Sequence, residues 1–153
     1  MRRALCIILL LARLALAGVF LWAAWGKIAD PAAFALAVYR YRILPSWAVN
    51  AFALWLPWIE VLAALALLTP GRRWRAAGAA LAAGMLAAFT AAYAAALARG
   101  LSIACGCFTL RADAAAGGWT TLARNAALFA LAAGVFADAF FARRRPTPSP
   151  ENP

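Results

Sequence analysis

Two cysteines one residue apart carry the most obvious chemistry of this chain. Cys105 and Cys107 flank Gly106 in a polar stretch of an otherwise apolar sequence. In an oxidising compartment such a pair cycles through, or rests as, a disulfide. A ring closed over one residue holds the two Cα atoms near the limit of disulfide geometry, which makes the bond easier to reduce. Gly106 supplies the backbone freedom that this ring needs.

The cysteine pair suits disulfide exchange better than structural bracing, because so small a ring removes little chain entropy. Two free buried thiols, or a disulfide that only stiffens the loop, are the alternatives.

Glu60 is the second candidate, because a carboxylate inside an apolar segment is usually paired or functional. One interpretation is a buried ion pair between Arg13 and Glu60, which would set helix register more than it would add stability. Arg13 lies nine residues from Ala4 and Glu60 lies nine residues from Thr69, the cytosolic ends of their apolar runs. At 1.5 Å per residue, both should lie roughly 14 Å into the membrane. The other interpretation is that Glu60 relays a proton for quinone or thiol chemistry. In that case Lys27 competes with Arg13 as the charged partner of Glu60.

Histidine is absent, and this narrows the choice of cofactors. Its absence removes the commonest metal ligand and the usual haem ligand, and two neighbouring cysteines do not reach the four ligands of a zinc site. We therefore predict no metal, and a membrane quinone is the one candidate cofactor. Trp55 and Trp58 could form a stacking wall for its ring, although the tryptophans are more simply explained as an interfacial belt.

The elements that must position these residues are membrane helices. Of the 153 residues, 67% are hydrophobic and 13% are charged, whereas in soluble domains about half are apolar and a quarter charged. A helix needs about 20 apolar residues to cross a bilayer. Four apolar runs meet this length, so we predict an all-α four-helix transmembrane bundle in one domain, residues 1–142, with spans at about 4–26, 48–69, 76–98 and 119–142. The basic, Pro-rich tail 143–153 should be disordered in the cytosol.

The first apolar run has two interpretations. Its arginine pair and the sequence Ala15-Leu16-Ala17 resemble a cleavable signal peptide. The run continues through residue 25 to a membrane-spanning length, which favours a retained first helix. Asp30 followed by Pro31 then has the form of a helix N-cap and first residue. We expect a short amphipathic helix there, lying at the membrane interface.

The net charge of +10 comes largely from arginines that flank the apolar runs. Such clusters are topology determinants and do not indicate nucleic-acid binding, because no soluble domain stands behind them. They place both termini and the 70–75 connection in the cytosol. The loop with Cys105 and Cys107 then faces the periplasm of a bacterial inner membrane, whereas Cys6 lies on the cytosolic side. The clustered residues are Arg2, Arg3, Arg72, Arg73, Arg75, Arg143, Arg144 and Arg145.

Taken in order, several short motifs resemble the MauE family of methylamine-utilisation membrane proteins, within the wider DoxX-like group. The resemblance covers most of residues 15–130. It implies a helper in methylamine metabolism that matures a periplasmic, disulfide-rich client, the small subunit of methylamine dehydrogenase, together with a thioredoxin-like partner. The family pattern has glycine where Thr109 stands here. The matching motifs are Lys27-Ile28-Ala29-Asp30-Pro31, Phe34, Tyr41, Leu44-Pro45, Leu56-Pro57-Trp58-Ile59-Glu60, Arg99-Gly100 and Cys105-Gly106-Cys107-Phe108.

These observations lead to one functional hypothesis and one alternative. The hypothesis is thiol–disulfide exchange at the outer face, with Cys105 and Cys107 passing redox equivalents between a thioredoxin-like protein and a membrane quinone. The exchange partner must come from another protein, because Cys6 is expected on the far side. The alternative is a non-catalytic membrane scaffold or accessory subunit whose cysteine loop is only structural.

Overall fold

The structure is a computed structural model that describes residues 2–101 and 118–141. These residues form helices and connections and contain no strand. Four helical segments are long and apolar enough to cross a bilayer, namely Ile7–Ala29, Ser46–Leu68, Arg72–Ala98 and Trp119–Phe141. The predicted all-α, four-span membrane fold is therefore confirmed.

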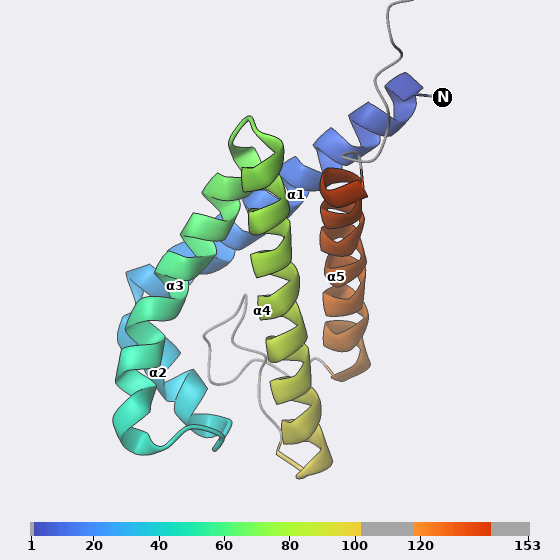
Figure 1. Cartoon of the computed structure of the whole chain (residues 1–153). Helices are drawn as coiled ribbons and strands as arrows, with labels where there is room; N and C mark the ends of the chain where they lie inside the picture. Colours follow the sequence, from blue (N-terminus) through green and yellow to red (C-terminus); the bar gives the residue numbers. More distant parts are fainter. Residues whose placement is uncertain (1, 102–117, 142–153) are drawn as a thin grey trace, which may run out of the picture.

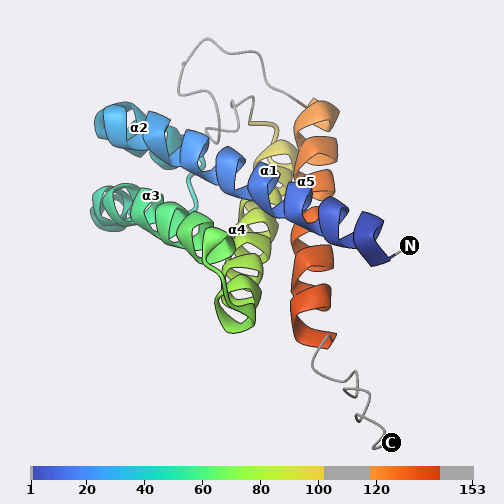
Figure 2. The same cartoon turned by 90° about the horizontal axis from the view of Figure 1, so that it is seen from above.

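The helices are α1 (Arg2–Ala29), α2 (Pro31–Arg40), α3 (Ser46–Leu68), α4 (Arg72–Ala98) and α5 (Gly118–Phe141). The long helices alternate in direction, so α1 and α4 end where α3 and α5 begin (Figure 1). We call this end of the bundle, which also carries α2, the α2 end. Helix α1 packs along α3, α3 along α4, and α4 along α5 (Figure 2).

The core lies between the four long helices α1, α3, α4 and α5, and it contains many alanines. Gly78 of α4 faces the backbone of α3 so closely that a Cβ atom there would lie 2.8 Å from Leu67 N and 2.9 Å from Ala63 O. Close packing of small residues is how helices associate in lipid, which provides no hydrophobic drive between them. The other core residues include Leu16, Ala17, Phe20, Ala64, Ala79, Ala82 and Leu86. Leu16 and Ala17, from the motif that resembles a cleavage site, thus belong to the packed interior.

The short helix after the first span is present as α2. The carboxylate of Asp30 accepts a hydrogen bond of 2.9 Å from the Ala33 amide, and Pro31 is its first residue. Phe34 is the side chain that α2 buries. Its position at the membrane interface remains a prediction.

The connection between α3 and α4 is shorter than the predicted 70–75 turn. Helix α4 begins at Arg72, so three arginines lie in its first turns and only residues 69–71 join the helices. Gly71 has a φ of 147°, a conformation that costs glycine little. Because the turn is complete at Gly71, the arginines that follow it can belong to α4. Arginine has a good intrinsic helix propensity.

Candidate functional site

A buried ion pair joins the last turn of α1 to the middle of α3. Lys27 Nζ, from the last turn of α1, donates to Glu60 Oε1 over 2.5 Å. Both side chains are 2% exposed. Glu60 is therefore paired inside the bundle, and its partner is the residue that the sequence offered only as a competitor.

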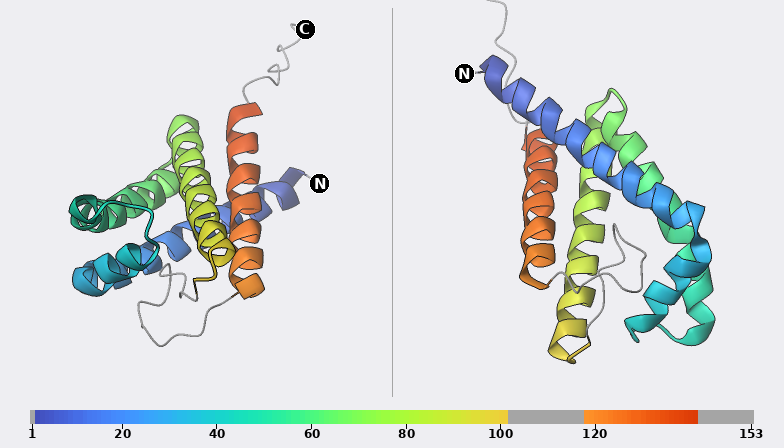
Figure 3. Two further views of the ribbon diagram at one scale, coloured as in Figure 1. Left: turned by 90° about the horizontal axis from the view of Figure 1, so that it is seen from below. Right: turned by 180° about the vertical axis from the view of Figure 1, so that it is seen from behind.

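The predicted ion pair between Arg13 and Glu60 was wrong. Arg13 instead donates from Nε and Nη2 to the carbonyl oxygen of Leu67, over 3.0 and 2.7 Å. The prediction assumed that the two helices end at the same depth. In the structure the first part of α1 projects beyond the end of α3 (Figures 2 and 3), so Arg13 lies level with the last turn of α3. There it binds a carbonyl that the helix end leaves without an intrahelical partner.

Aromatic rings surround the Lys27 ammonium. Its nitrogen lies 5.3 Å from the centre of the Phe34 ring and 5.8 Å from that of Phe89. Both distances are within the range of cation–π attraction. Phe89 does not stand out as a site residue in the sequence, where its one signal is a large aromatic side chain in a helix rich in alanine.

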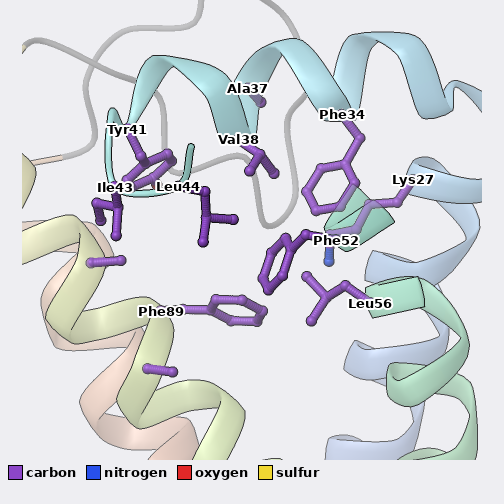
Figure 4. A pocket seen from close by; sticks show the side chains of 12 residues that line it. Lys27, Phe34, Ala37, Val38, Tyr41, Ile43, Leu44, Phe52, Leu56 and Phe89 are labelled. Carbon is purple, nitrogen blue, oxygen red and sulfur yellow. The ribbon is translucent and has the colours of Figure 1, made fainter. Parts of the chain in front are cut away.

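A cavity of about 220 Å³ lies next to this pair, between α2, α3 and α4. Figure 4 shows the rings of Phe34, Phe52 and Phe89 around a common space, with the Lys27 nitrogen directed toward it. Trp55 and Trp58, the alternative candidates for a stacking wall, do not line this cavity and are 70% and 56% exposed. The lining residues are Lys27, Phe34, Ala37, Val38, Tyr41, Ile43, Leu44, Phe52, Leu56, Ala88, Phe89 and Ala92.

Glu60 also borders a second, much smaller space of about 20 Å³, which it shares with Asn125 of α5. Asn125 is 1% exposed. Neither Glu60 Oε2 nor Asn125 Nδ2 has a hydrogen-bond partner among the described residues. Two buried polar atoms of opposite hydrogen-bonding character therefore border one space, and this arrangement did not follow from the sequence.

Cys105 and Cys107 lie outside the described residues, but the chain that leads to them is fixed at the α2 end. Arg99, just after α4, donates to the carbonyl oxygens of Tyr41 and Arg42 over 2.8 and 3.3 Å. This ties the end of α4 to the connection between α2 and α3. Cys6 belongs to the first turns of α1, toward the opposite end of the bundle.

The fold and this interior define a multi-pass membrane protein, whose described residues include four helices long enough to span a bilayer, a buried Lys–Glu pair and an aromatic cavity beside it. A family model described as methylamine utilisation protein MauE matches residues 5–138. The chain therefore belongs to the MauE family, whose members are membrane proteins implicated in methylamine utilisation. A search of curated proteins and a search of solved structures gave no match.

Proposed function

We propose that this protein performs thiol–disulfide exchange at the periplasmic face of a bacterial inner membrane, with Cys105 and Cys107 as the reacting thiols. The observation that carries the proposal is the Cys105-Gly106-Cys107 sequence in a chain of this family. Its client is a disulfide-containing periplasmic protein, by family resemblance the small subunit of methylamine dehydrogenase. A thioredoxin-like periplasmic protein is the second partner.

The exchange needs only thiolates and a disulfide. A client thiolate attacks one sulfur of the Cys105–Cys107 disulfide and releases the other as a thiolate, which gives a mixed disulfide. A second client thiolate then attacks the mixed bond and completes the client disulfide. Cys105 and Cys107 are then both thiols, because the pair has taken two electrons from the client. The disulfide of a thioredoxin-like protein oxidises the pair again by the reverse exchange and is itself reduced to two thiols.

The described residues fix the point from which the chain leads to the two cysteines. The Arg99 contacts hold Leu101 and its neighbours beside the α2–α3 connection. Cys105 follows Leu101 by four residues, and four extended residues span at most about 14 Å. This reach is compatible with exchange near the α2 end, where Leu101 lies. Lys27 and Glu60 support this end by holding α1 against α3, and Glu60 is also the candidate proton relay.

Trapping of mixed disulfides tests the proposal. Membranes carrying Cys105→Ser or Cys107→Ser are quenched with acid and alkylated, and disulfide-linked adducts are identified by mass spectrometry. We expect one variant to retain a covalent adduct with a thioredoxin-like or client protein, because the second cysteine is no longer present to resolve it. Cys6→Ser is the matched control and should trap nothing. An intact client in the double variant, with no adduct in either single variant, would instead indicate a scaffold whose cysteine loop is structural.

A further inference from the structure

We propose that the cavity at the α2 end binds the single ring of a membrane benzoquinone, with the Lys27 ammonium donating a hydrogen bond to one ring carbonyl oxygen. The proposal concerns described residues alone and does not depend on thiol exchange. It rests on the size of the cavity, the composition of its lining and the unused donors of Lys27.

The size of the cavity matches one substituted six-membered ring. Benzene occupies an engineered protein cavity of about 150 Å³, and the cavity here measures about 220 Å³. The difference leaves room for a few small substituents on the ring. Ile43 and Phe52 line the cavity and are 50% and 39% exposed, so it reaches the outer surface of the bundle. An isoprenoid tail can leave there toward lipid.

The lining suits a flat, apolar ligand with few polar atoms. Phe34, Phe52 and Phe89 come from α2, α3 and α4 and surround one space (Figure 4). Offset stacking and edge contacts with such rings favour an aromatic or quinonoid ring over a flexible chain. Lys27 is the one charged residue among the described residues that line the cavity. Apolar walls with a small number of polar groups are typical of sites that bind small organic molecules.

Lys27 can donate to a ligand without leaving Glu60. An ammonium group has three donors, and one is used in the bond to Glu60 Oε1. The nitrogen also lies near the rings of Phe34 and Phe89, which accept no conventional hydrogen bond. At least one donor is therefore available to a carbonyl oxygen in the cavity.

The charge of the pair selects a neutral ligand. Glu60 already neutralises Lys27, so a bound carboxylate or phosphate would bring an uncompensated negative charge into the bundle, which is costly in a membrane interior. A lipid acyl chain is neutral but has no acceptor for the ammonium. A quinone is neutral and has carbonyl acceptors at opposite edges of a flat ring. It satisfies both requirements.

The test is photolabelling of the purified protein in lipid nanodiscs with a benzoquinone that carries an azido group on the ring and a ten-carbon tail. Labelled peptides are mapped by mass spectrometry. We expect labels on residues of α2, α3 and α4 that line the cavity, and competition by the unmodified decyl benzoquinone. Decanol, which has a chain of the same length without the ring, should not compete.

Two variants separate the ring site from general affinity for lipid. Ala92→Phe fills the cavity and should weaken labelling about tenfold, whereas Ala91→Phe, its outward-facing neighbour, should not. The double variant Lys27→Met/Glu60→Met removes the donor together with its partner, so no unpaired charge remains, and it should weaken labelling by a similar factor. Equal labelling of all these proteins, or competition by decanol, would show a lipid chain in the cavity and overturn the proposal. Labelling of the Cys105→Ser/Cys107→Ser protein should persist, which separates this site from the thiol chemistry.

Discussion

Lys27 at the end of α1 and Glu60 in the middle of α3 face each other across 2.5 Å inside the bundle. Their charges cancel, so the bundle carries two ionised groups at this depth without a net charge. Lys27 lines the larger cavity beside α2, and Glu60 borders the smaller space that it shares with Asn125. The pair therefore both holds two helices together and presents polar atoms to the interior.

The first prediction concerns what happens when this pair is broken from one side. Lys27→Met should lower the free energy of unfolding by roughly 3–5 kcal/mol, because it leaves Glu60 charged and unpaired, whereas Lys27→Met/Glu60→Met should cost much less. Thermal unfolding in detergent measures the difference. If the double variant is as unstable as the single one, the two residues are not energetically coupled.

The second prediction concerns Arg13, which serves the end of α3 and not Glu60. Arg13→Met should destabilise the protein by about 1.5–3 kcal/mol, because a charged donor is lost from the Leu67 carbonyl. Arg13→Lys should recover only part of this loss, since an ammonium cannot reproduce the two parallel bonds of a guanidinium. Arg73→Met, at an exposed arginine of α4, is the control. The charge-swapped Arg13→Glu/Glu60→Arg protein should be no better than its single variants, and rescue by the swap would contradict the observed pairing.

The third prediction uses two glycines of α4. Gly78→Ala should destabilise the α3–α4 contact by roughly 1–3 kcal/mol, because the added methyl group meets the backbone of Leu67 and Ala63 and the helices must separate. Gly84 has no atom within 4 Å of an added Cβ. Gly84→Ala should therefore be neutral, or stabilising by up to about 1 kcal/mol through helix propensity. Thermal unfolding of both proteins under one condition makes the comparison, and equal losses would argue against the close approach at Gly78.

The fourth prediction concerns Asn125, whose buried Nδ2 has no partner among the described residues. An unsatisfied buried donor costs about 1–3 kcal/mol. Asn125→Leu removes this donor and leaves an apolar side chain of similar size beside the small space that Glu60 also lines. The substitution should therefore preserve or raise the stability of the protein. Asn125→Asp should lower stability, because it adds a second carboxylate near the first. A marked loss of stability in Asn125→Leu would mean that the amide makes a bond that the described residues do not provide.

The helices of this fold were predictable because lipid imposes a minimum length on every apolar run. The short helix α2 was predictable because Asp30 and Pro31 form a local signal that needs no tertiary information. The partner of Glu60 was not, because pairing between helices depends on their tilt and on how far each extends beyond the other. An equal count of residues from each end placed Arg13 opposite Glu60, whereas the projection of α1 places Lys27 there.

The cavity could not be predicted from the sequence for a related reason. Phe34, Phe52 and Phe89 are far apart in the chain and come from three helices, and no spacing rule connects them. Trp55 and Trp58 are among the larger aromatic residues of α3, but both are exposed. In a membrane helix the outer surface is as apolar as the interior, so hydrophobicity does not indicate which aromatic residues face inward.

The last prediction concerns the sidedness on which the exchange chemistry depends. The arginine clusters predict that Cys105 and Cys107 face the periplasm and that Cys6 faces the cytosol. Two proteins test this, one retaining only Cys105 and the other only Cys6. In intact cells a membrane-impermeant maleimide, applied after mild reduction, should label the first and not the second. Both should react after the inner membrane is permeabilised, unless the Cys6 thiol is packed against neighbouring helices, in which case denaturation in detergent exposes it. Labelling of Cys6 from outside would reverse the orientation, place the cysteine pair in the reducing cytosol and remove the physical basis for a resting disulfide.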